Sequence, residues 1–307
     1  MEVLIITIIT RTLIAGVPLL LGTVGEIITE RSGILNLGAE GCIAGGAVAA
    51  FAVTAATGNP VIGTLAGMGF AMFLALIHAV ASIGFLANQT VSGLAITMLG
   101  LGIAGMWGKP FIGQPGTAHV EPLRLPLLGD IPGLGRILNG LDGFFWLAVF
   151  LSLAAWLYLE KTRGGIRLRT CGENPRAAEA LGIPVAWVRL GATVAGGAFF
   201  GLAGAFLSLS YSSSWNEAMT GGRGWIANAL CIFALWNPAR AFVGAFLFGG
   251  IFVLQYVLQP LGIPSNLLGT LPYLATLGVL MVDGLHTDHR QLHAPAALGV
   301  SFVRGER

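Results

Sequence analysis

Ionisable residues gather between residues 25 and 41, GEIITERSGILNLGAEG, in a chain that is otherwise largely apolar. The segment carries three carboxylates, one guanidinium and one amide: Glu26, Glu30, Glu40, Arg31 and Asn36. Charged groups near a membrane are costly unless they are paired or hydrated, so we predict structural ion pairs between Arg31 and Glu26 or Glu30. Glycine-interrupted helices also mark substrate pathways in transporters, which makes Asn36 and Glu40 candidates for lining a path. A helix-ending turn with local ion pairs is the alternative interpretation.

A second polar segment covers residues 212–237, SSSWNEAMTGGRGWIANALCIFALWN. The apolar run after its glycines is too short to cross a bilayer comfortably, which predicts a broken or re-entrant element. Four side chains are candidates for lining a path for a planar, polar solute: Trp215, Asn216, Trp225 and Asn228. Tryptophan is also a typical interfacial anchor, so both interpretations stay open.

A third polar segment, residues 160–189, is rich in arginine and contains a short helix with both ends marked. Asn174 is a good N-cap, Pro175 fits the first helical position, and Gly182 ends the helix. A helix of about two turns has no independent stability in water, so this helix is expected to fit a groove on another protein. Arg176 and Glu179 are its predicted polar contacts, and Ala178 lies between them.

Enzymatic chemistry is not expected within the chain. The pair Gly108–Lys109 is followed by Pro110 and lacks the spacing of a phosphate-binding loop. The tail histidines His286, His289 and His293 are interpreted as solvated residues, so no metal site is predicted. The three cysteines have no paired spacing, and the net charge of +2 does not suggest nucleic acid.

The elements that must position these residues are membrane helices. Hydrophobic residues make up 55% of the 307 residues, charged residues only 10%, and the mean hydropathy is +0.81. This composition predicts an all-α polytopic membrane protein with about 8–10 transmembrane helices, some of them short or broken. The apolar runs lie at about 3–24, 39–57, 61–86, 91–108, 143–159, 190–211, 225–237, 241–258 and 267–284. We expect one transmembrane domain over residues 1–285 and a tail over residues 286–307.

Orientation follows from the basic residues, which favour the cytoplasmic side. Most of the 16 lysines and arginines fall on one side if residues 160–189 form a cytoplasmic loop. The same alternation places the N-terminus outside, the C-terminus in the cytoplasm, and residues 109–142 in an external loop.

The motifs in these segments together resemble a known family. Residues 30–41 resemble the ERSG-x-x-N-x-G-x-EG signature of bacterial ABC importer permeases for simple sugars and nucleosides. These belong to the wider branched-chain amino acid/ribose permease family. Residues 172–183 are similar to its ATPase-coupling loop, and residues 222–227 with 236–238 to its GRG-x-IA and W-x-P elements. The similarity runs from about residue 10 to 285.

The resemblance implies a type II-like ABC importer permease in the bacterial inner (plasma) membrane, with residues 174–182 as the coupling helix. The implied partners are an ABC ATPase subunit, a second homologous permease subunit and a periplasmic or lipid-anchored solute-binding protein, besides membrane lipid. No cofactor is expected in this chain, because ATP and Mg would bind to the ATPase.

A nucleoside or simple sugar is the favoured solute, and riboflavin-like compounds or branched-chain amino acids remain alternatives. A stand-alone secondary transporter would need an ion-coupling relay, for which only Arg11 and His78 are candidates in mid-span. A scaffold without transport would not need a docking helix.

Overall fold

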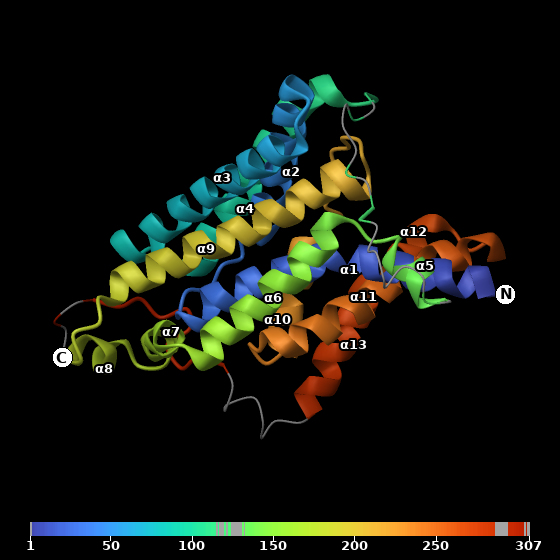
Figure 1. The fold of residues 1–307 in the computed structure, drawn as a ribbon. Helices are drawn as coiled ribbons and strands as arrows, with labels where there is room; N and C mark the ends of the chain where they lie inside the picture. The colour runs from blue at the N-terminus through green and yellow to red at the C-terminus, as the bar shows by residue number, and fades with distance from the viewer. Residues whose placement is uncertain are drawn as a thin grey trace.

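The computed structural model describes residues 2–114, 116, 120, 122–123, 131, 133–285, 294–303 and 305. Every regular element in these residues is a helix, which confirms the predicted all-α class (Figure 1). The tail histidines His286, His289 and His293 and much of the expected 109–142 loop lie outside the described residues.

Seven helices of the described part are long and apolar enough to cross a membrane. They are α1 (Glu2–Arg31), α2 (Ala39–Thr57), α3 (Pro60–Ala79) continued by a π-helical turn (η1, Val80–Gly84), α4 (Gln89–Gly108) continued by η2 (Lys109–Phe111), α6 (Gly143–Lys161), α9 (Val185–Phe206) continued by η3 (Leu207–Tyr211), and α11 (Pro238–Leu258) continued by η4 (Gln259–Leu261). The shorter helices are α5 (Leu134–Leu138), α7 (Arg163–Glu173), α8 (Pro175–Ala180), α10 (Arg223–Phe233), α12 (Ser265–Leu268) and α13 (Leu271–Leu285).

The two remaining predicted spans, 225–237 and 267–284, are the short helices α10 and α13. They contain 11 and 15 residues, or about 16 and 22 Å of helix, against about 30 Å of hydrocarbon core. Within the described ranges the apolar runs thus correspond to seven full-length spans and two partial ones, where nine spans were predicted. The expectation that some helices would be short or broken is confirmed.

Helices α1, α2 and α9 form the centre of the bundle. Helix α2 packs against α3, α4 and α9, and α1 packs against α9, α10 and α11. Glycines bring these backbones together: a Cβ on Gly41 would lie 2.5 Å from the carbonyl oxygen of Ile96, and one on Gly201 would lie 2.5 Å from that of Gly67. Lipid supplies no hydrophobic driving force between helices, so helix association relies on close packing, which small residues at the contacts allow.

The two ends of the bundle carry different features (Figure 1). The N-terminus and α5 lie at one end, here called the far end. Helices α7 and α8 and the C-terminal residues lie at the opposite end, here called the coupling end. This arrangement agrees with the predicted placement of the N-terminus and the 160–189 loop on opposite sides of a membrane.

Candidate functional site

The first polar segment folds into a buried, non-helical connection between α1 and α2. Residues 32–38, here called the link, are mostly buried. Before the link, Arg31 contacts Trp236, just beyond the end of α10; after it, Glu40 contacts the start of α10. The link therefore runs antiparallel to α10, along the roughly 16 Å length of that helix. It stays mostly buried from the end of α1 to the start of α2.

Side chains from three positions satisfy the backbone of the link. Gln89 Oε1 accepts a hydrogen bond from the N–H of Leu35 (2.7 Å), and Thr97 Oγ1 donates to the carbonyl of Leu37 (2.7 Å). His78 Nε2 lies 3.1 Å from the carbonyl oxygen of Leu35. Irregular backbone at membrane depth is stable only when protein groups satisfy it in this way. His78 thus has a structural role in the described part of the chain.

Glu40 caps the partial helix α10 from outside that helix. Its Oε1 accepts from the N–H of Gly222 (3.0 Å) and its Oε2 from the N–H of Gly224 (2.6 Å). The first N–H groups of a helix have no partner within it, and the helix dipole favours a negative charge there. A Cβ on Gly224 would lie 2.4 Å from both the Cα and the backbone N of Glu40, so glycine is needed for this approach. The EG and GRG motifs are therefore two halves of one contact.

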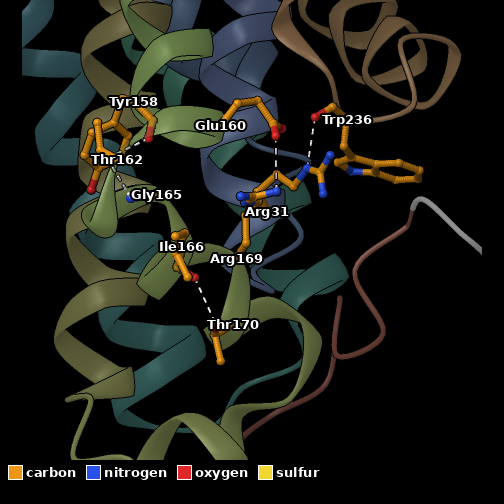
Figure 2. Close-up of polar contacts among 9 residues, drawn as sticks. All are labelled: Arg31, Tyr158, Glu160, Thr162, Gly165, Ile166, Arg169, Thr170 and Trp236. Carbon is orange, nitrogen blue, oxygen red and sulfur yellow. Dashed lines mark hydrogen bonds and ion pairs between the residues drawn. The ribbon is translucent and has the colours of Figure 1, made fainter.

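Glu30 and Arg31 hold the turn that follows α10. Trp236 Nε1 donates to Glu30 Oε2 (2.5 Å), and Arg31 Nε donates to the carbonyl of Trp236 (2.9 Å; Figure 2). Leu235 and Trp236 have φ values of 52° and 53°, in the left-handed region that non-glycine residues rarely adopt. The two hydrogen bonds with Glu30 and Arg31 offset the strain of this turn. They also join the ER motif to the W-x-P motif.

The expected ion pairs of Arg31 are not formed in the described part of the chain. The Glu30 carboxylate accepts from Trp236 and Cys231, and both buried carboxyl oxygens of Glu26 have no hydrogen-bond partner among the described residues. The reason is helical geometry, because residues one or five apart lie on different sides of a helix, whereas Glu26 and Glu30 are four apart. Arg31 instead lies beside the ion pair between Arg169 and Glu160 (3.2 Å; Figure 2).

Three of the six path candidates gather around the link. Asn228 Nδ2 donates to the carbonyl of Asn36 (3.4 Å), near the position where Glu40 caps α10. Among the described residues, the buried atoms Asn36 Nδ2 and Asn228 Oδ1 have no hydrogen-bond partner. Buried polar atoms of this kind are expected to contact water or a solute.

The other three candidates lie elsewhere. Trp215 is buried over Gly108 at the far end of α4, whereas the end of the link contacts Ile96, twelve residues and about 18 Å earlier in that helix. Asn216, beside Trp215, is exposed, and so is Trp225 on α10. The six residues therefore do not line one common site in this conformation.

The third polar segment folds into two helices at the coupling end. Thr162 Oγ1 accepts from the N–H of Gly165 and starts α7, a helix that the sequence pattern did not predict (Figure 2). The short helix α8 was predicted and is confirmed: Asn174 Oδ1 accepts from the N–H of Ala177 (3.0 Å), and Gly182 has a φ of 77°.

Helix α8 has an inner and an outer face. Ala178 is fully buried and packs against Cys171 and Val185, so it holds α8 against α7 and the start of α9. Asn174 and Arg176 are exposed, and Glu179 borders a cleft of about 470 Å³ at the end of the helix. The outer face is thus polar and accessible, as docking on another protein requires.

Arg189 connects the coupling end to the link. Its guanidinium is buried and donates to three backbone carbonyls, those of Ser32 (3.0 Å), Val300 (3.1 Å) and Cys171 (3.2 Å). Helix α9 begins at Val185, five residues before the predicted span, and this first turn places Arg189 between the three segments. Sequence reasoning used Arg189 only for orientation, because carbonyl partners leave no sequence signature.

Comparison with known proteins identifies this architecture. The sequence matches, over residues 8–280, the family described as the branched-chain amino acid transport system permease component. The chain belongs to this family. The resemblance of its motifs to ABC importer permeases is thereby confirmed, and the chain is a multi-pass membrane permease subunit. No solved structure matches it significantly.

Three curated relatives align with nearly the whole permease. The putative glucose ABC transporter permease protein TsgC13 of Haloferax volcanii is 37% identical over 95% of this chain and 96% of its own. The guanosine ABC transporter permease protein NupQ of Bacillus subtilis is 35% identical over 98% and 97%. The nucleoside ABC transporter permease protein NupC of Lactococcus lactis is 31% identical over 97% of each chain.

Proposed function

We propose that the chain forms part of the translocation path of an importer for an uncharged, ring-bearing solute of the nucleoside or simple-sugar class. The similarity of the whole chain to permeases named for glucose, guanosine and nucleosides supports this solute class. All of these solutes are hydroxyl-rich and carry no net charge.

The cap on α10 carries the argument for a neutral solute. Transporters often hold an anionic substrate group at the N-terminus of a broken helix within the membrane. In this chain the Glu40 carboxylate already occupies that position on α10. An amino acid would bring a second carboxylate next to Glu40, at a cost in charge repulsion, whereas a neutral solute would not.

Energy comes, on this proposal, from an ABC ATPase subunit that binds ATP and Mg and docks on the outer face of α8. A second permease subunit completes the path, and a solute-binding protein delivers the solute at the far end. The coupling end then faces the cytoplasm and the N-terminus faces outward.

A charge reversal at Arg176 tests the docking. We expect Arg176→Glu to reduce co-purification with the ATPase and ATP-dependent uptake, because Arg176 is exposed on α8. Arg240→Glu is the matched control, since Arg240 is exposed at the start of α11, outside the α7–α8 segment. Equal behaviour of the two variants would rule out α8 as the docking site.

Cysteine labelling tests the orientation. Ala177 is exposed on α8, so Ala177→Cys should react with a membrane-impermeant maleimide in inverted vesicles and not in intact cells. Labelling in intact cells would reverse the proposed topology.

Competition for uptake tests the solute class. Proteoliposomes that contain the complete transporter should accumulate labelled guanosine or glucose, and excess leucine should not compete. Accumulation of leucine in preference to both would contradict the argument from Glu40.

A further inference from the structure

The C-terminal residues Ala294–Val303, here called the strap, dock between α7, α9 and the link. The N–H of Ala297 donates to the carbonyl of Gly172 at the end of α7 (2.8 Å). The N–H of Gly299 donates to the carbonyl of Gly33 in the link (3.2 Å). The strap is thus the one segment, within the described part of the chain, that bonds through its own backbone N–H groups to both α7 and the link.

Two side-chain contacts hold the same strap in place. Arg189 donates to the carbonyl of Val300 (3.1 Å), and Glu173 Oε2 accepts from the N–H of Ala296 (3.2 Å). Phe302 packs against the buried cluster of Cys171, Ala178 and Val185, behind α8. Ordering these residues costs conformational entropy, which their contacts must offset. Four hydrogen bonds along one short segment therefore indicate that the strap is a docked part of the fold and not a free tail.

The strap also shapes the surface beside the outer face of α8. One hollow is bordered by residues 173–176, where α8 begins, and by strap residues 296–297 and 300–303. The 470 Å³ cleft at the other end of α8 is bordered by residues 182–187 and again by Phe302 and Val303. Two large apolar side chains, Leu181 and Trp187, are 77% and 73% exposed close to this cleft. The helix and the strap therefore form one continuous, partly apolar surface.

We propose that the strap is a working part of the coupling machinery: it completes the ATPase-docking surface with α8 and transmits the displacement of α8 to the link. This inference rests on the proposed ABC-importer function. The physical reason is connectivity, because Phe302 lies directly behind α8, while Gly299 is bonded to the link that leads to Glu40 and the cap of α10. Removing the strap leaves Arg189 as the remaining described side chain that bonds both α7 and the link.

A pair of truncations tests the proposal in the complete transporter. A stop after His293 removes the strap, and a stop after Val303 leaves the strap and removes only the residues that follow. We expect loss of the strap to lower solute-stimulated ATP hydrolysis and uptake about tenfold, within the range of ordinary coupling energies. The stop after Val303 should behave as wild type.

Point variants keep the test valid if the shorter chain is not inserted in the membrane. Phe302→Ala removes the contact behind α8, and Phe150→Ala, the same change at an exposed position on α6, is its matched control. Phe302→Ala should reduce stimulated hydrolysis and uptake several-fold with normal membrane levels. Phe150→Ala should leave both unchanged.

Thiol labelling reports directly on docking of the strap. Burial raises the pKa of the Cys171 thiol, an effect that Arg189 opposes, and the side chain is fully covered. Because the thiolate is the reactive form, Cys171 should react slowly with a permeant maleimide in wild type. Labelling, located by mass spectrometry, should accelerate in the chain that stops after His293. Fast labelling in wild type would show that the strap is not docked.

The outcomes separate the two proposals. If wild type shows no ATP-dependent uptake with its ATPase and binding protein, the proposed function fails. If wild type is active and both the strapless chain and Phe302→Ala match it, the importer stands and the role of the strap is overturned.

Discussion

The link and the coupling end are both polar, glycine- and arginine-containing interruptions of an apolar chain, yet they use their polar groups in opposite ways. In the link, backbone groups are satisfied by His78, Gln89 and Thr97, and Glu40, just after the link, caps α10. At the coupling end, α8 is anchored through buried Ala178 and leaves its polar face exposed. Burial thus distinguishes a polar segment that bonds within the chain from one whose polar face stays accessible, and on the proposed function that accessible face is where the ATPase docks.

Arg189 bridges the two regions, so its loss should have the largest effect. Arg189→Ala would leave three carbonyls, two of them in buried hydrogen bonds, without their donor and should lower the free energy of unfolding by about 3 kcal/mol. Thermal unfolding in detergent measures this. The stability of Arg189→Lys should fall between those of wild type and Arg189→Ala, because an ammonium group cannot reproduce the planar geometry of a guanidinium. An unchanged midpoint for Arg189→Ala would show that the two regions are held independently.

Mutation of the α10 cap should have the next largest effect on stability. This cap lies beside the link and away from the coupling end. Glu40→Ala removes two charge-assisted hydrogen bonds and should cost about 2–4 kcal/mol of unfolding free energy. Glu40→Gln keeps one acceptor oxygen and should cost about half as much. The same unfolding assay compares them, and equal losses would mean that the charge, and not the hydrogen bonds, stabilises α10.

Added side-chain volume should lower stability where α2 packs closely against α4, just after the link. Gly41→Ala forces a Cβ to 2.5 Å from the Ile96 carbonyl oxygen, a clash with backbone that should cost about 1–3 kcal/mol. Gly102→Ala, on α4, places a Cβ with no atom within 4 Å and is the matched control. Comparable unfolding midpoints for the two variants would contradict the close packing of α2 on α4.

The smallest change in stability should come with a disproportionate change in function. Asn174→Ala removes the cap of α8 and should cost about 1 kcal/mol locally. Asn59→Ala removes the equivalent cap of α3 at a similar cost. Uptake measurements should show a loss for Asn174→Ala and little change for Asn59→Ala. The reverse result would place the functional sensitivity outside the coupling end.

Local signals in the sequence predicted the elements best. Asn174, Pro175 and Gly182 determine α8 through their own backbone preferences, so the helix could be placed without knowledge of the fold. The shortness of the run after Gly224 likewise predicted the partial helix α10. The partial length of α13 could not be predicted, because the run at 267–284 is as apolar as those that cross the membrane; in the structure α13 packs against α10 and α11.

Contacts between distant segments were mostly beyond prediction. Arg31 was expected to find a carboxylate nearby in sequence, but its helical position turns it toward Trp236. The role of Arg189 and the docking of the strap depend on backbone carbonyls, which every residue has. The family motifs indicated which residues matter, while the structure shows that the EG and GRG motifs meet.

The bond between Gly299 and Gly33 joins the first connection of the chain to its last described segment. Most of the polypeptide lies between them, so this contact can form only after every intervening helix has been synthesised. Contacts of such sequence separation are late events in assembly. On the proposed function, the surface that the ATPase contacts is therefore completed only after the helices that precede the strap have been made.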